Sequence, residues 1–214
     1  MLDTIHVIDF EGNRIYGILE YGLVTLKNNT IVEFSTASCC EKFSTQVAHF
    51  TEHSRFTGNG GDKGFEEHLP FFIKKRAEGI FCAHGASGED RLLRRYCLTP
   101  GAIDDHLKNT QKVSQKNAEL ATATASVVTW GPWIDTYKIY RKYYPTAQRY
   151  EVAELIRHFG LEKKLEEQVA KQRLSRELTF HRAPYDALAT ALLLQNFIEH
   201  FQIEDICFLL DISV

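Results

Sequence analysis

The sequence predicts an α/β protein in which helices flank a mixed five-stranded sheet, three strands forming an antiparallel meander and the other two lying parallel. Three segments rich in β-branched and aromatic residues open the chain. Two short apolar segments follow later, each accompanied by segments with apolar residues at helical spacing. Because the chain has 214 residues, 44% of them hydrophobic, and no linker rich in proline or glycine, we expect a single domain over residues 1–214.

The opening segments predict the meander. Residues 5–9 (IHVID) form a short apolar run that ends in an acid, which indicates a buried strand. Residues 14–26 and 31–35 are also rich in strand-forming side chains. Asn28 and Asn29 stand between them, and asparagine tolerates the positive φ angles of a tight hairpin turn. We therefore expect three antiparallel strands.

The pattern then alternates between helix and strand. Residues 65–75 have helical spacing, and residues 79–83 and 127–134 have strand-like composition. Further helices are expected at residues 89–98, 136–144, 152–159, 161–176 and 184–201. The stretch at about 104–126 is polar and lacks aromatic residues, which is typical of an insertion or a flexible arm.

Composition and charge exclude several classes of protein. No run approaches the ~18–20 apolar residues of a membrane span, and the acidic N-terminal segment is unlike a targeting signal, so we expect a cytoplasmic protein without a membrane partner. Five cysteines without a C-x-x-C pair argue against a disulfide framework and a structural zinc site. The net charge of −3 gives no general basic field, so a polyanionic substrate would be held locally, by a groove or by metals.

Asp9 and Glu11 close the first predicted strand. Alternate residues of a strand point to the same face, so these carboxylates project together while Phe10 points into the core. Two adjacent carboxylates repel each other unless a cation lies between them, and Mg²⁺ or Mn²⁺ prefers such oxygens. The pair indicates a metal site. The alternative is coincidence, because a chain of this length and composition contains about one D-x-E sequence by chance.

His181 and Asp186 stand five residues apart at the start of the last long apolar segment. Five helical steps of about 100° would place them on different faces, so we expect His181 in the loop before the helix and Asp186 in its first turn. A histidine with a pKa near ~6.5 can act as a general base at neutral pH. The structural alternative is a helix-capping acid beside a surface histidine.

A third acidic segment lies between these two. The strand predicted at residues 79–83 runs into His84 and Gly85, and Glu89 and Asp90 follow at the start of a predicted helix. This arrangement aims a carboxylate at the end of the sheet. The alternative is an acid that interacts only with the helix dipole.

The order and context of these three segments resemble the motifs of the DnaQ-like DEDDh 3′→5′ exonucleases, which include polymerase proofreading subunits and ribonuclease T. LEYGLV at residues 19–24 and WIDTY at residues 133–137 are similar to further segments of that family. The resemblance covers about residues 5–200. It implies a ribonuclease-H-like fold and hydrolysis at the 3′ ends of single-stranded DNA or RNA, which releases nucleoside 5′-monophosphates.

The resemblance also implies a role for each motif residue. It places metal ligands and a general base at four positions: Asp9, Glu11, Asp186 and, as the base, His181. The second-motif acid is either Glu89, which the register favours, or Asp90, which has the usual side chain. Together the acids would hold two Mg²⁺ or Mn²⁺ ions, one of which activates the water from which His181 takes a proton.

Two positions depart from the family pattern. The family usually has threonine after the first-motif glutamate and asparagine after the second-motif histidine, whereas this chain has Gly12-Asn13 and Gly85. We therefore expect atypical handling of the substrate. The residues implied near the last nucleotides are Phe10, Gly12, Asn13, Phe65 and His84. Core packing is the alternative for the aromatic ones.

Two other functions stay open at this point. One is a non-catalytic module that binds nucleic acid or a polymerase partner on a degenerate exonuclease fold. The other is a different metal-dependent phosphohydrolase, such as an endonuclease, but the placement of His181 before Asp186 favours the exonuclease. The sequence leaves open the choice between DNA and RNA and the formation of a homodimer.

Overall fold

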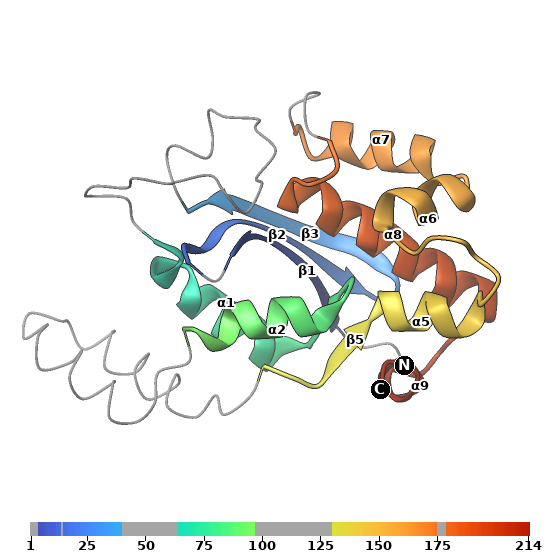
Figure 1. The fold of residues 1–214 in the computed structure, drawn as a ribbon, viewed down its shortest axis with the longest axis horizontal. Helices are drawn as coiled ribbons and strands as arrows, with labels where there is room; N and C mark the ends of the chain where they lie inside the picture. The colour runs from blue at the N-terminus through green and yellow to red at the C-terminus, as the bar shows by residue number, and fades with distance from the viewer. Residues whose placement is uncertain (1–3, 14, 40–63, 97–129, 175–178) are drawn as a thin grey trace, which may run out of the picture.

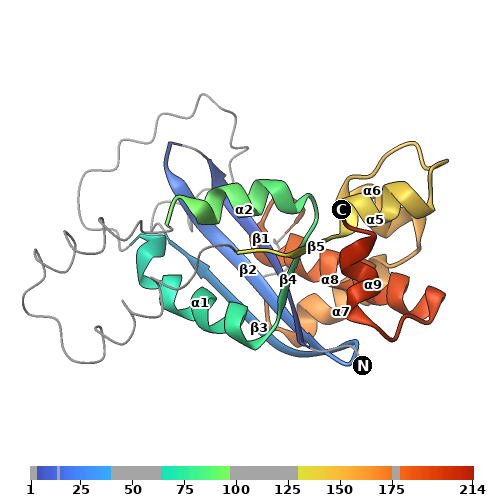
Figure 2. The same ribbon diagram turned by 90° about the horizontal axis from the view of Figure 1, so that it is seen from below.

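The computed structural model describes residues 4–13, 15–39, 64–96, 130–174 and 179–214. A mixed sheet forms the centre of the molecule, and helices lie against both of its faces (Figures 1 and 2). The insertion expected at residues 104–126 and the first residues of the strand expected at 127–134 lie outside the described part of the chain.

The sheet has five strands in the order β3-β2-β1-β4-β5. β1 (Thr4–Asn13), β2 (Gly17–Lys27) and β3 (Thr30–Ser38) form the antiparallel meander. β4 (Ile80–Ala83) pairs parallel to β1, and β5 (Trp133–Asp135) pairs parallel to β4. The predicted fold class, a mixed five-stranded α/β sheet flanked by helices, is confirmed.

Asparagine side chains and backbones shape both turns of the meander. Asn28 and Asn29 link β2 to β3 with φ angles of 47° and 59°, the left-handed conformation that a type I′ hairpin requires at both central positions. At the first turn, Oδ1 of Asn13 accepts hydrogen bonds from the backbone N–H groups of Ile15 and Tyr16 at 2.8 and 2.9 Å. Because these residues belong to the turn, β2 begins at Gly17 rather than at residue 14.

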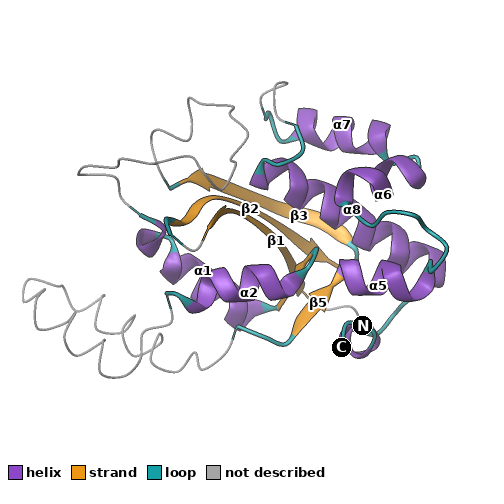
Figure 3. Ribbon diagram, viewed as in Figure 1, coloured by secondary structure: helices purple, strands orange, loops and turns teal. Residues whose placement is uncertain are grey.

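Helices cover the two faces of the sheet with separate apolar clusters (Figure 3). α1 (Leu69–Glu78) and α2 (Ala86–Arg94) contribute to the cluster that includes Ile8 and Phe10 of β1. α8 (Ala183–Phe201) crosses the other face against β1 and β2. Its residues 187–194 are all buried, because the sheet lies on one side of the helix and two further helices lie on the other.

The remaining described helices are the short 3-10 helix η1 (Phe65–Glu67), α5 (Thr136–Tyr143), α6 (Val152–His158), α7 (Glu162–Lys171) and α9 (Ile206–Asp211). α6 and α7 pack on α8, and α9 packs beside β5. The sequence predicted all of these except α9, a short helix whose first turn is capped by the side chain of Asp205 through the Cys207 N–H at 2.9 Å. Among the helices that the structure describes, none combines the length and the apolar character needed to cross a bilayer.

Candidate metal centre

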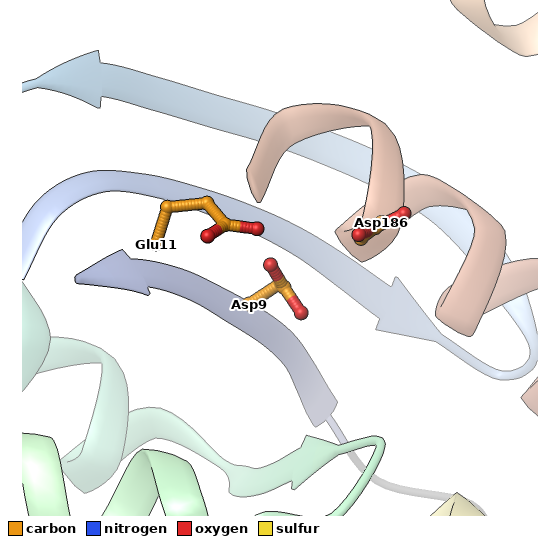
Figure 4. Close-up of side chains that lie close together, drawn as sticks. All are labelled: Asp9, Glu11 and Asp186. Atoms are coloured by element: carbon orange, nitrogen blue, oxygen red, sulfur yellow. The ribbon is translucent and has the colours of Figure 1, made fainter. Parts of the chain in front are cut away.

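Three carboxylates from distant parts of the chain converge near the end of β1. Asp9 and Glu11 project from the face of β1 that α8 covers, and Asp186 lies in the first turn of α8 (Figure 4). One oxygen from each side chain lies within 4.8 Å of the oxygens from the other two. Carboxylate oxygens this close can share a divalent cation.

α8 reaches this position because Gly22 of β2 leaves room for it. Gly22 is the cross-strand partner of Asp9. A Cβ atom at Gly22 would lie 2.3 Å from the carbonyl oxygen of Ala183 and 2.7 Å from Cα of Pro184. Without a side chain there, the first turn of α8 rests directly on β2, which brings Asp186 beside Asp9.

The turn before α8 connects His181 to Asp186. His181 has a φ angle of 69°, and its backbone N–H donates a hydrogen bond to Oδ2 of Asp186 at 3.0 Å. The His181 side chain is exposed. Among the described residues no donor reaches Oδ1 of Asp186, although that atom is buried. One oxygen of Asp186 is thus fixed by the turn, and the other has no hydrogen-bond partner in the described part of the chain.

Burial and mutual repulsion favour the protonated acids. Burial, followed by the charge of Asp186, raises the pKa of Glu11 to about 8. The pKa of Asp9 lies well above its usual value, first because of burial and then because of the charges of Glu89, Asp186 and Glu11. Burial also raises the pKa of Asp186. A bound cation would stabilise the ionised carboxylates, so metal binding and proton release are coupled here.

The donor set fits a hard divalent cation. All three clustered side chains offer carboxylate oxygens, the ligands that Mg²⁺ and Mn²⁺ prefer. One of these oxygens is buried and has no partner among the residues that the structure describes. Over the described ranges of the chain, the cluster includes no thiol and no imidazole nitrogen, the ligands typical of zinc and copper sites.

Glu89 and Asp90, neighbours on α2, have different surroundings. Oε2 of Glu89 is buried without a hydrogen-bond partner among the described residues. The charge of Glu89 contributes more than that of any other group to the raised pKa of Asp9. Asp90 instead accepts hydrogen bonds from Nε of Arg94 at 2.5 Å and from Nε1 of Trp133 at 3.1 Å. The charge of Glu89 therefore acts on Asp9 of the cluster, whereas the carboxylate of Asp90 is bound by Arg94 and Trp133.

The aromatic residues expected near the substrate are engaged within the protein. Phe10 and Phe65 are 6% and 1% exposed, and their rings meet edge to face with centroids 5.6 Å apart. Both rings therefore pack in the core, which was the alternative to a contact with substrate. His84 uses both ring nitrogens, Nδ1 with Oγ1 of Thr136 at 2.9 Å and Nε2 with the backbone oxygen of Tyr150 at 2.6 Å. Its ring joins the end of β4 to the segment before α6.

The departures from the family pattern have backbone explanations. A Cβ atom at Gly12 would lie 2.1 Å from the carbonyl oxygen of Gly17, so a threonine does not fit in this hairpin. The next residue, Asn13, uses its side chain to form the turn. Gly85 has a φ angle of 84°, a left-handed conformation that asparagine also adopts more readily than most residues. Its N–H donates to Oδ1 of Asp135 at 3.0 Å.

Glu20 and Arg182 border the cluster and were not identified from the sequence. Glu20 is the cross-strand partner of Glu11, is only 3% exposed, and forms an ion pair with Arg182. The available signal was a single acid within the otherwise uncharged run at residues 15–26. Nothing in that run indicated its partner, which is 162 residues away in the chain.

No protein-family model matches the chain, and no curated protein does. Among solved structures, the chain is similar to exonuclease X in complex with 5′ overhanging duplex DNA, with a TM-score of 0.56 and 18% sequence identity. The similarity covers 98% of this chain and 99% of that chain. The two proteins therefore share a fold over nearly their whole lengths.

Proposed function

We propose that this chain is a metal-dependent 3′→5′ exonuclease that hydrolyses the terminal phosphodiester of single-stranded nucleic acid and releases nucleoside 5′-monophosphates. The observation that carries the proposal is the convergence of Asp9, Glu11 and Asp186 next to the turn that contains His181. The fold shared with exonuclease X and the order of the sequence motifs support the same function.

Asp9, Glu11 and Asp186 are the proposed metal ligands, with Glu89 completing the acidic set for two ions. When bound, Mg²⁺ or Mn²⁺ supplies positive charge and Lewis acidity at the phosphodiester. The carboxylates must lose their protons to bind a cation, and their raised pKa values make this step dependent on pH.

His181 is the proposed general base. Its backbone is held by the hydrogen bond to Asp186, while its exposed side chain can rotate toward a water molecule at the cluster. The imidazole accepts the proton that this water loses on attacking phosphorus. General-base catalysis of this kind contributes about 10²–10⁴-fold to a rate.

DNA is the first substrate to examine, because exonuclease X was solved with duplex DNA that carries a 5′ overhang. An acidic cluster repels phosphate unless cations are present, so we expect binding of the reactive end to require the metal. The non-catalytic alternative predicts nucleic-acid binding without such a requirement.

The test uses oligonucleotides labelled at the 5′ end: single-stranded DNA, single-stranded RNA and duplex DNA with a 5′ overhang. Each is incubated with the purified protein and either Mg²⁺ or Mn²⁺. We expect stepwise shortening from the 3′ end, release of 5′-mononucleotides and complete inhibition by a chelator. Asp186→Asn should abolish the reaction, whereas Asp211→Asn, at an exposed acid of α9, should leave it unchanged.

Two outcomes would contradict the proposal. Absence of shortening with every substrate and both metals would favour the non-catalytic module, and direct binding to labelled oligonucleotides would then test that function. Internal cuts that also occur in circular single-stranded DNA would favour an endonuclease.

A further inference from the structure

A partly buried ion pair connects the beginning of α8 to β2. Glu20 points to the same face of the sheet as its partner Glu11, and its carboxylate accepts several hydrogen bonds from the α8 side. Nε of Arg182 donates to Oε1 and Oε2 of Glu20 at 3.2 and 3.0 Å, and Nη2 donates to Oε1 at 2.5 Å. The Glu20 side chain is 4% exposed and that of Arg182 is 20% exposed, so water competes little for this interaction.

Glu20 also acts as the cap of α8. The residue before the helix, Arg182, does not cap it with its own side chain. Instead, Oε2 of Glu20 accepts a hydrogen bond from the backbone N–H of Ala183 at 3.0 Å. The second residue, Pro184, has no N–H, and the N–H groups of Tyr185 and Asp186 donate to the carbonyl oxygen of Arg182 at 2.9 and 3.0 Å. A strand residue thereby completes the first turn of this helix.

Arg182 lies between two residues of the proposed site. The residue before it, His181, adopts the left-handed conformation and donates its N–H to Asp186. Asp186 follows four residues after Arg182, in the first turn of α8. By holding Arg182, the Glu20 side chain therefore restricts the main chain that carries His181, the proposed base, and Asp186, the proposed metal ligand.

We propose that Glu20 and Arg182 are positioning residues, whose ion pair holds the His181–Asp186 turn so that Asp186 meets Asp9 and Glu11. This inference rests on the proposed function of the same site. It assigns the pair no contact with metal or substrate. Residues that orient metal ligands in this way typically change metal affinity or activity by about 10–100-fold when replaced.

Breaking the ion pair would destabilise the fold even if the pair had no role at the site. The test must therefore distinguish a change in the position of Asp186 from a general loss of folding stability. Arg182→Met keeps an unbranched, flexible stem but removes the guanidinium donors, whereas Arg182→Lys keeps the charge and one point of attachment. Glu20→Gln keeps an acceptor and removes the charge. The matched control is Lys75→Met, which breaks the partly buried Lys75–Glu33 pair of 2.5 Å on the part of the sheet away from the cluster.

The main readout is Mn²⁺ binding measured by calorimetry without nucleic acid, together with hydrogen exchange of residues 181–186 in the metal-free protein. We expect Arg182→Met to bind Mn²⁺ about 10–100-fold more weakly and to exchange faster in this segment. Its kcat should fall by a similar factor while KM changes less than about threefold. Arg182→Lys should recover part of each loss, and Lys75→Met should match the wild type in Mn²⁺ affinity and exchange of the segment.

Several results would overturn the positioning role. One is a folded Arg182→Met protein with wild-type Mn²⁺ affinity, exchange and kcat; another is an equal loss in Lys75→Met. If Arg182→Met does not fold, Arg182→Lys and Glu20→Gln decide by the same criteria. A wild-type protein without nuclease activity would contradict the proposed function alone, because Mn²⁺ binding and hydrogen exchange would still decide whether the pair positions Asp186.

Discussion

Asp9 and Gly22 are directly opposed across β1 and β2, and the absence of a side chain at Gly22 is what admits the first turn of α8 beside Asp9. Gly22 therefore permits the geometry of the cluster although it contributes no carboxylate to it. A strand, its neighbour and a distant helix have to meet at this one point.

Replacement of Gly22 tests this relationship. The Cβ of Gly22→Ala would lie 2.3 Å from the Ala183 carbonyl oxygen, so the start of α8 must move outward. We expect a loss of about 1–3 kcal/mol in the free energy of unfolding, measured by urea denaturation, and weaker Mn²⁺ binding. Gly88→Ala is the control, because a Cβ on that helical residue meets nothing within 4 Å. A wild-type stability for Gly22→Ala would contradict the close approach.

His181→Asn tests the proposed base separately from the backbone hydrogen bond at the same residue. Asparagine tolerates the left-handed conformation that His181 adopts at φ 69°, so the hydrogen bond to Asp186 should persist. We expect kcat to fall by about 10²–10⁴-fold, with Mn²⁺ affinity nearly unchanged. Single-turnover kinetics and calorimetry on the same preparation measure the two quantities. A kcat within a factor of two of the wild type would exclude His181 as the base.

The adjacent acids of α2 should differ in their importance. Glu89→Gln removes a charge that acts on Asp9, and we expect it to lower activity by at least about tenfold and to weaken metal binding. Asp90→Asn should keep activity within about threefold, because Asp90 bonds to Arg94 and Trp133 away from the cluster. Metal titrations of the cleavage rate compare the two variants. The reverse ranking would make Asp90 the second-motif acid.

The stability of the metal-free protein should depend on pH through Glu11. Its pKa is about 8 in the folded protein against an ordinary value of 4.5, so the folded state holds a proton that the unfolded chain has released between these values. The free energy of unfolding should therefore fall as pH rises from about 5 to about 8, by roughly 2–5 kcal/mol, and level off above. Urea denaturation with a chelator measures this slope. Glu11→Gln should make the slope shallower without removing it, because the raised pKa values of Asp9 and Asp186 act in the same direction. A free energy of unfolding that rises with pH in this range would contradict the prediction.

Introducing the threonine that the resembled exonuclease family usually has at position 12 should harm this protein. In Gly12→Thr the new Cβ would lie 2.1 Å from the Gly17 carbonyl oxygen, so the end of the β1–β2 hairpin must open. We expect a loss of about 1–3 kcal/mol of stability and no gain in activity, judged by thermal denaturation and the cleavage assay. Improved activity would show that the hairpin adapts at little cost.

Local signals in the sequence predicted most of the fold. The Asn28-Asn29 pair identified its hairpin because these residues adopt positive φ angles, and helical spacing identified α8 although tertiary packing makes it almost wholly buried. α9 was not predicted, since a helix of six residues has little intrinsic stability and depends on β5 and on the Asp205 cap.

The site could be predicted only in part, for a physical reason. Strand alternation indicates that Asp9 and Glu11 share a face, and this depends on neighbouring residues alone. The roles of Glu20 and Gly22 depend instead on a helix that begins more than 160 residues later, and no local pattern reports that contact. The choice between Glu89 and Asp90 likewise depends on which of them meets Arg94 and Trp133.

The enclosure of α8 between the sheet and α6 and α7 has one more consequence. Asp186 lies in the first turn of a helix that is buried along most of its length. We therefore expect its backbone to keep its position as long as the core stays folded. Heat inactivation should accordingly coincide with global melting instead of preceding it, and the acids should need no closing motion to assemble around a newly arrived strand end.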